Sequence, residues 1–180
     1  MTRLALGSLV LCGVILAGCS AGSAVSVGKN LTRKDSHLKL WLDGQEAKQN
    51  MLKKAAKGYA RYEVKEPVSV SPKFKYEIED VDKFGFIKST HIQVHQKFEA
   101  DFSDIADFII FAKNSKDRNA DLKPGVEYDL ANLGPNFTIL NGRTDQEVSK
   151  VEFKPGVKYM LVFTVIADKS ESTQIFFDTK

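Results

Sequence analysis

The sequence contains very few of the residues that build covalent or metal-bound frameworks. Its 180 residues include two cysteines, Cys12 and Cys19, and none beyond position 19. The long remainder of the chain therefore has no disulfide, no CxxC metal site and no thiol nucleophile. Its fold must be stabilised by a hydrophobic core, for which a hydrophobic fraction of 43% is sufficient.

The motifs of the common enzyme classes are missing as well. The chain has no G-x-S-x-G, no H-E-x-x-H, no phosphate-cradling glycine loop and no dinucleotide fingerprint. Its three histidines are His37, His91 and His95. The last two would lie about 13 Å apart on one face of a strand, which is too far to share a metal ion directly. These absences favour a protein that is not an enzyme and has no metal or cofactor.

Acidic residues leave one catalytic alternative open. Two carboxylates held about 5–10 Å apart in a cleft can act as an acid and a base in hydrolysis. Solvated charge at strand ends and in loops is the more ordinary interpretation. The acidic sets are Glu77, Glu79, Asp80 and Asp82, and then Asp101, Asp104 and Asp107.

The N-terminal segment has the pattern of an export signal. One positive charge, Arg3, precedes an apolar run of 15 residues from Leu4 to Gly18. A helix that crosses a membrane needs about 20 apolar residues. A charged start, a short apolar centre and an end of small residues are typical of a secretory signal. We therefore expect residues 1–18 to be a signal peptide.

The end of this segment, Leu16-Ala17-Gly18-Cys19, resembles the lipobox of bacterial lipoproteins. The resemblance implies cleavage between Gly18 and Cys19 and attachment of lipid to Cys19, which would become the first mature residue. More than one acyl chain makes such an anchor stable. Because Ser20 rather than an aspartate follows the cysteine, the resemblance implies the periplasmic face of the outer membrane of a Gram-negative bacterium.

Charge is distributed unevenly along the chain. Residues 19–61 contain nine Lys or Arg and three Asp or Glu, a balance of +6. Residues 62–180 contain sixteen basic and twenty acidic residues, a balance of −4. A basic segment near an anionic membrane gains roughly 1 kcal/mol per Lys or Arg, although a solvated helix face has the same composition. Nucleic acid is not an expected partner.

Composition predicts a flexible tether over residues 19–40 and an amphipathic helix over residues 41–61. Asp43 and Glu46 have the spacing of a capping box. Every fourth residue from Ala47 to Tyr59 is apolar. The residues that could contact the membrane surface are basic: Lys48, Lys53, Lys54, Lys57 and Arg61.

Beyond Pro67, β-rich runs alternate with turn signals, which predicts a mainly β domain over residues 62–180. We expect an antiparallel β-sandwich, immunoglobulin-like or transthyretin-like. The run Tyr159–Ala167 is almost continuously apolar and should be a central strand buried on both faces. The predicted strands are Phe74–Glu79, Phe86–Phe98, Phe108–Lys113, Val126–Leu130, Phe137–Leu140, Val148–Phe153, Tyr159–Ala167 and Thr173–Asp178.

A short phrase occurs twice in this domain. The first copy is LKPGVEY over residues 122–128, and the second is FKPGVKY over residues 153–159. Proline followed by glycine predicts a tight turn that leads into a strand. The second copy resembles the tyrosine corner of immunoglobulin-like domains, which implies a hydrogen bond from Tyr159 back across the turn. The turn residues are Pro124, Gly125, Tyr128, Pro155, Gly156 and Tyr159.

These features favour a non-catalytic lipoprotein that binds another envelope protein or helps to assemble an envelope complex. The lipobox, the size and a sandwich with an added helix are similar in architecture to the small lipoprotein of type VI secretion systems. An immunity or inhibitor lipoprotein directed against a toxin or a lytic enzyme is an alternative. An envelope hydrolase or a carrier of a small ligand is an alternative of another class.

Overall fold

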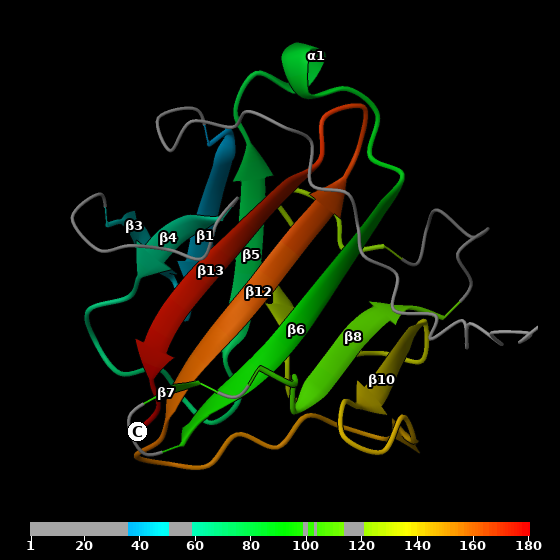
Figure 1. Ribbon diagram of the computed structural model, residues 1–180. Coiled ribbons are helices and arrows are strands. Elements are labelled where there is room, and N and C mark those ends of the chain that lie inside the picture. Colours follow the sequence, from blue (N-terminus) through cyan, green and yellow to red (C-terminus); the bar gives the residue numbers. More distant parts are fainter. Residues whose placement is uncertain (1–35, 51–58, 99–100, 103, 114–120) are drawn as a thin grey trace, which may run out of the picture.

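The computed structural model describes residues 36–50, 59–98, 101–102, 104–113 and 121–180. Over these residues the chain is mainly β, as predicted, and contains one short helix, α1 (Val81–Phe84). The strands form a sheet of four and a sheet of nine (Figure 1). Neighbouring strands run antiparallel except β4 and β13, which are parallel.

The large sheet has the order β11-β10-β8-β6-β12-β13-β4-β3, and β7 pairs with the end of β6. Its three longest strands, β6, β12 and β13, lie side by side at its centre (Figure 1). The bounds are β3 (Lys48–Gln49), β4 (Ala60–Glu63), β6 (Ser89–Phe98), β7 (Asp101–Phe102), β8 (Phe108–Ala112), β10 (Phe137–Asn141), β11 (Glu147–Val148), β12 (Lys158–Ile166) and β13 (Glu171–Asp178).

The small sheet has the order β2-β1-β5-β9 and covers one face of the large sheet. Its strands are β1 (Leu38–Leu42), β2 (Gln45–Glu46), β5 (Lys73–Ile78) and β9 (Tyr128–Asp129). Phe74 and Tyr76 of β5 lie against Phe163 of β12, with ring centroids 5.0 and 4.8 Å apart. The two sheets therefore share one hydrophobic core.

Each strand range expected beyond Pro67 overlaps an observed strand, although several of the observed strands are shorter than predicted. The β12 strand is buried from Tyr159 to Val165, which confirms that both of its faces are covered. The range 148–153 keeps strand structure only at its start, in β11, although Val151 and Phe153 are buried. Apolar side chains can fill a core without belonging to a strand, and composition alone does not separate the two cases.

The helix expected over residues 41–61 is wrong wherever the structure describes this range. Trp41 and Leu42 end β1, and Asp43 and Gly44 form a two-residue turn into β2. Both turn residues have positive φ, 49° and 74°, as the hairpin turn of type I′ requires. The Asp43 carboxylate accepts hydrogen bonds from the backbone N–H groups of Ser69 and Lys73, at 2.6 and 2.7 Å, instead of capping a helix.

Two further parts of this region also differ from the prediction. Residues 48–49 and 60–63 are strands, while residues 51–58 of the expected helix lie outside the described residues. The expected tether over residues 19–40 is too long, because Leu38 and Leu40 of β1 are 3% and 0% exposed in the core. The alternation of apolar and polar residues in Leu38-Lys39-Leu40 fits a strand and not a tether.

The two Pro-Gly turns have the same local geometry. Gly125 and Gly156 have φ of 79° and 71°, a region that glycine adopts without steric cost. The hydroxyl oxygen of Tyr128 accepts a hydrogen bond of 2.9 Å from the backbone N–H of Lys123. The hydroxyl oxygen of Tyr159 accepts one of the same length from Lys154, so the expected hydrogen bond across the turn is confirmed.

Candidate functional site

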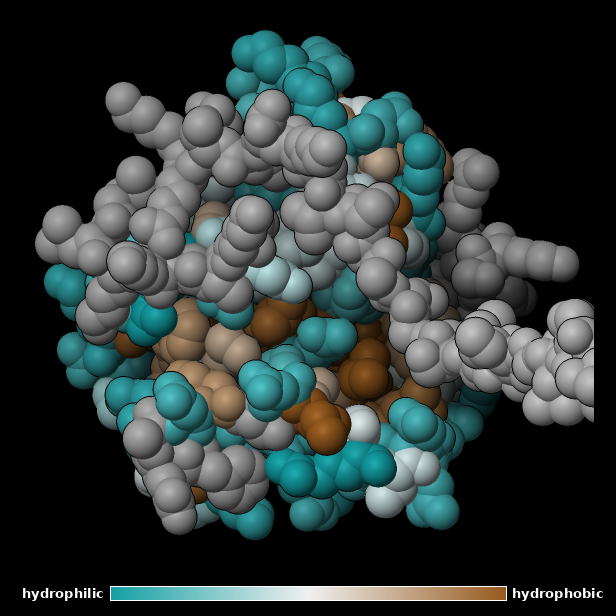
Figure 2. Space-filling model, in the orientation of Figure 1, coloured by the Kyte–Doolittle hydropathy of each residue, from teal (hydrophilic) through white to brown (hydrophobic). Residues whose placement is uncertain are grey.

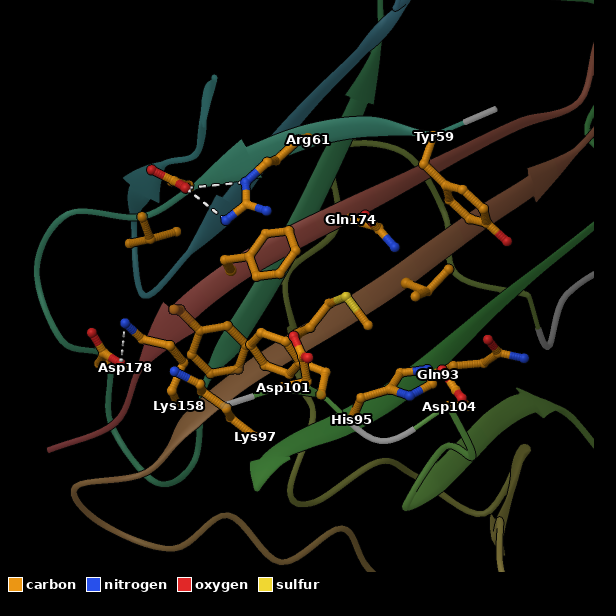
Figure 3. A pocket seen from close by; sticks show the side chains of 17 residues that line it. Tyr59, Arg61, Gln93, His95, Lys97, Asp101, Asp104, Lys158, Gln174 and Asp178 are labelled. Carbon is orange, nitrogen blue, oxygen red and sulfur yellow. Dashed lines mark hydrogen bonds and ion pairs between the residues drawn. The ribbon is translucent and has the colours of Figure 1, made fainter. Parts of the chain in front are cut away.

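A groove of about 970 Å³ lies on the face of the large sheet that points away from the small sheet. Its floor comes from β4, β6, β12 and β13, and residues of β7 line one side (Figure 3). Side chains of a strand alternate between the two faces of a sheet. Because Ile92 and Val94 point into the core, the neighbouring Gln93 and His95 face the groove.

The centre of the groove is apolar. Met160, Val162 and Phe176 form a second hydrophobic cluster, separate from the main core, and Tyr59 and Phe102 contact it. The ring of Phe102 meets that of Phe176 edge to face, with centroids 5.3 Å apart. Figure 2 shows the corresponding hydrophobic area on this side of the molecule, bordered by hydrophilic residues.

One wall of the groove carries an ordered arginine. The guanidinium carbon of Arg61 lies 3.7 Å from the centre of the Phe176 ring, within range of a cation–π interaction. Nε and Nη2 of Arg61 donate to Oε1 of Glu63 at 3.1 and 3.0 Å. Oε2 of Glu63 accepts from Nδ2 of Asn50 at 2.9 Å. These contacts hold the guanidinium group above the apolar floor.

The rest of the rim is polar and carries charge of both signs. Lys158 and Asp178 form an ion pair of 3.3 Å at one end of the groove. Lys97, Asp101 and Asp104 complete the rim on the side of β6 and β7 (Figure 3). An apolar floor inside a polar rim is the arrangement found at protein interfaces, where a buried anchor is surrounded by polar contacts.

The carboxylates suggested for hydrolysis do not act as one set. Asp101 and Asp104 line the groove and are exposed. Asp107 is instead bound by the backbone N–H of Gln96 at 2.6 Å and by Arg143 Nη2 at 3.2 Å. Asp107 therefore has a structural role at the start of β8.

His91 and His95 occupy the same outward face of β6. His95 is 6% exposed and lines the groove, and burial lowers the pKa of His91. Within the described parts of the chain, no group of three or more His, Cys, Asp or Glu side chains is arranged to hold a metal ion.

The structure describes two of the basic residues proposed for membrane contact, Lys48 and Arg61. Lys48 of β3 forms an ion pair with Glu46, and Arg61 belongs to the groove. Lys53, Lys54 and Lys57 lie outside the described residues, as do Gly18 and Cys19. The basic helix face expected around Lys48 and Arg61 is therefore wrong, because both residues belong to strands.

A buried carboxylate that sequence inspection missed fixes the start of the described chain. Glu171, 5% exposed, accepts hydrogen bonds from the Ser36 hydroxyl and from the backbone N–H of His37, the latter at 3.1 Å. The Tyr62 hydroxyl lies 2.5 Å from Ser36 Oγ and 3.1 Å from the carbonyl oxygen of Leu38. Burial raises the pKa of Glu171, although its hydrogen bonds with Ser36 and His37 oppose the shift. The chain thus enters β1 at a defined position.

Comparison with known proteins gives no further indication of function. No family model, no curated protein and no solved structure matches the chain. In the part of the chain that the structure describes, none of the helices has the length and apolar character needed to cross a membrane.

Proposed function

We propose that this protein is a lipid-anchored component of the bacterial outer membrane, on its periplasmic face, whose groove binds a segment of another envelope protein. The location rests on the resemblance of Leu16–Cys19 to a lipobox. The binding role rests on one structural observation, the apolar floor of Met160, Val162 and Phe176 on the outward face of the sheet.

The physical argument is that a partner in the groove would cover apolar surface that is still exposed. Met160, Val162 and Phe176 are 8%, 6% and 9% exposed, so the gain comes from the partly exposed Tyr59 and Phe102 that pack against them. Burying apolar surface contributes about 25 cal/mol per Å², and aromatic anchors in a pocket with a polar rim provide most of the affinity of many interfaces. The stack of Arg61 on Phe176 presents a rigid surface that needs little reordering on binding.

The fold proposed for this function is an immunoglobulin-like or transthyretin-like sandwich. Two sheets that share a core and the hydrogen bond of Tyr159 support it. The similarity to the type VI secretion lipoprotein now rests on the lipobox, the size and the β-rich fold, because the expected helix is not found in the described residues.

Variants of the groove floor test the binding role. Met160→Gln places a polar group in the floor, and Phe102→Ser removes the aromatic ring that packs against it. We expect each to reduce recovery of a crosslinked partner from intact cells about tenfold or more, which corresponds to a loss of about 1.4 kcal/mol in binding. Val126→Gln, at an exposed apolar residue outside the groove, is the matched control. Thermal unfolding shows whether the variants keep the fold. Recovery that is equal in all folded variants would reject the groove as the binding site.

The anchor is tested separately. Cys19→Ala removes the acceptor of the lipid, so the protein should move from the outer-membrane fraction to the soluble periplasmic fraction. A Cys19→Ala protein that stays with the outer membrane would contradict lipid anchoring. Deletion of the gene distinguishes an assembly role, through loss of secretion, from an immunity role, through sensitivity to neighbouring cells.

A carrier of a small ligand is the second candidate, and the size of the groove favours it. Ligand pockets are typically 300–1,000 Å³ in volume, and the groove of about 970 Å³ lies at the upper end of that range. Native mass spectrometry of protein purified from its membrane would detect a co-purified ligand. A mass that equals the lipidated chain alone counts against this role.

A further inference from the structure

The end of the molecule where the chain enters β1 carries a projecting loop. The carbonyl oxygen of His37 accepts a hydrogen bond of 2.7 Å from the N–H of Glu79, and the His37 ring meets Phe84 edge to face at 6.3 Å. Residues 79–88, which contain α1, therefore lie beside the point where the N-terminal segment joins the domain. Figure 1 shows α1 at one end of the sheets, next to the turn between β12 and β13.

This loop holds two apolar side chains outward. Val81 and Phe86 are 60% and 55% exposed, whereas Phe84 between them is 1% exposed and anchors the loop in the core. The backbone N–H of Lys169 donates to the carbonyl oxygen of Phe84 at 3.3 Å. A Cβ atom on Gly85, whose φ is 86°, would lie 2.6 Å from Oδ2 of Asp168. The loop thus packs closely against the β12–β13 turn, and this packing restricts movement of Val81 and Phe86 into the core.

The charges around this loop balance one another. Lysines pair with acids at three places: Lys83 with Asp80 at 3.1 Å, Lys88 with Asp168 at 3.2 Å, and Lys39 with Glu79 at 2.6 Å. Asp82 and Lys169 add one charge of each sign. With Lys39, residues 79–88 and 168–169 therefore carry four acidic and four basic side chains. The loop and the turn beside it have no excess of charge to attract or repel an anionic surface, and their contact with lipid would be apolar.

The groove is found toward the other end of the same strands. Asp178, the last residue of β13, lines the groove, while Glu171, the first residue, binds Ser36 and His37. They are seven positions apart along the strand, which corresponds to roughly 23 Å at 3.3 Å per residue. The same polarity holds in β12, whose first residue, Lys158, lines the groove.

We propose that the α1 end is a membrane-contact surface, in which Val81 and Phe86 enter the lipid interface beside the anchor and the groove is presented away from the membrane. This inference rests on the lipid anchor of the proposed function. Residues 19–35, which lie outside the described residues, number 17. Because a chain spans at most about 3.6 Å per residue, they keep the domain within roughly 60 Å of the anchor, and a weak apolar contact is then enough to orient it.

Fluorescence quenching tests the orientation. The lipidated full chain, with Trp41→Phe to remove its only tryptophan, is reconstituted in zwitterionic vesicles that contain brominated lipid. A tryptophan introduced by Phe86→Trp should lose at least half of its emission. The matched control is Val70→Trp, because Val70 is 41% exposed and follows Ser69, which binds the turn at the opposite end of β1. Its emission should change little.

Further arms separate the failure of this inference from the failure of the anchor. Addition of 0.5 M salt should leave the quenching of Phe86→Trp unchanged. Loss of quenching in salt would show that the contact with the membrane is electrostatic and not apolar. If the lipidated protein floats with vesicles but Phe86→Trp is quenched no more than Val70→Trp, the orientation is wrong and the anchor stands. If lipidated and Cys19→Ala proteins float equally, or neither floats, the anchor itself is wrong.

Discussion

The two Pro-Gly turns have the same sequence pattern and the same hydrogen bond but different surroundings. Tyr159 is 1% exposed and its ring stacks on Phe177, with centroids 5.8 Å apart. Tyr128 is half-buried and meets Phe137 edge to face at 5.9 Å. The comparison shows that a local motif determines the shape of the turn, whereas the strands around it determine how much the turn stabilises the fold.

The turns also differ in how they are joined to the rest of the sheet. Asp129, next to Tyr128, accepts hydrogen bonds of 2.6 Å from both Ser71 Oγ and Lys73 Nζ. The second turn is held by an uncharged residue, Thr179, whose carbonyl oxygen accepts from Gly156 N–H at 3.0 Å. The first turn is therefore joined to the sheet by a hydrogen-bonded carboxylate. The second is joined through Thr179, and the exposed ion pair of Lys158 and Asp178 beside it adds little stability.

Removing the tyrosine rings should have the largest effect and should separate the two turns. Tyr159→Ala leaves a cavity between the sheets, and such substitutions of large aromatic residues cost about 3–5 kcal/mol. Tyr128→Ala should cost roughly half as much, because its ring is partly solvated already. Urea denaturation of both variants measures the free energies of unfolding. Equal losses would contradict the role assigned to the surrounding strands.

Acid should affect the first turn more than the second. Burial acts to raise the pKa of Asp129, but hydrogen bonds from Lys73, Ser71 and Asn132 outweigh it and hold the pKa well below its usual range. A carboxyl group whose pKa is lower in the folded protein stabilises the fold at pH values above its ordinary pKa of about 4. That stabilisation is lost as the pH falls through the pKa of the group in the folded protein.

The variant Asp129→Asn should therefore lose about 2 kcal/mol at pH 7. It should also show a smaller loss of stability than the wild type between pH 5 and pH 2, measured by chemical denaturation at each pH. Thr179→Val, at the second turn, is the comparison variant and should leave the slope against pH unchanged. A slope for Asp129→Asn as steep as that of the wild type would reject the ionic contribution.

Substitution of either glycine should cost the same unfolding free energy, in contrast to the tyrosine substitutions. An added Cβ would meet no atom within 4 Å at Gly125 or at Gly156, so only the positive φ opposes it. Gly125→Ala and Gly156→Ala should each cost about 1–2 kcal/mol in unfolding free energy. A much larger loss at one of them would show that its surroundings, rather than backbone strain, decide the outcome.

The smallest effects are expected when only the tyrosine hydroxyls are removed. Tyr159→Phe leaves the partly buried N–H of Lys154 without its acceptor and should cost about 1 kcal/mol. Tyr128→Phe exposes the N–H of Lys123 to water, which replaces the bond, and should cost less than about 0.5 kcal/mol. Amide hydrogen exchange at Lys154 and Lys123 would check both, with faster exchange expected in each variant.

The sequence was informative about β structure where local patterns and tertiary contacts agree. The apolar run of β12, the repeated turns and the strands beyond Pro67 carry patterns that need no knowledge of distant partners. Where the structure describes the expected helix, the prediction is wrong for two reasons. The apolar residues from Ala47 to Tyr59 fit a period of four, and Asp43-Gly44, which also fits a helix cap, is a hairpin signal. The pairing of β1 with β5 and of β4 with β13 overrides the local helix propensity of these residues.

The groove was beyond the reach of sequence patterns for a different reason. It joins Arg61 of β4, Met160 of β12 and Phe176 of β13, and their proximity follows from strand order and register. A single amino-acid sequence shows neither the order of the strands nor their register. Glu171 was missed in the same way, since its partners Ser36 and His37 are distant in the sequence.

The order of strands in the large sheet has a consequence for synthesis. The central partners β6 and β12 are far apart in the sequence, and Ala60 of β4 pairs with Thr173 of β13. Contacts between distant residues slow folding, because the entropy of closing long loops is lost before the contacts form. The centre of the sheet cannot assemble until almost the whole chain has left the ribosome. Throughout that interval the emerging polypeptide has no complete core, and it can still be threaded through a narrow pore.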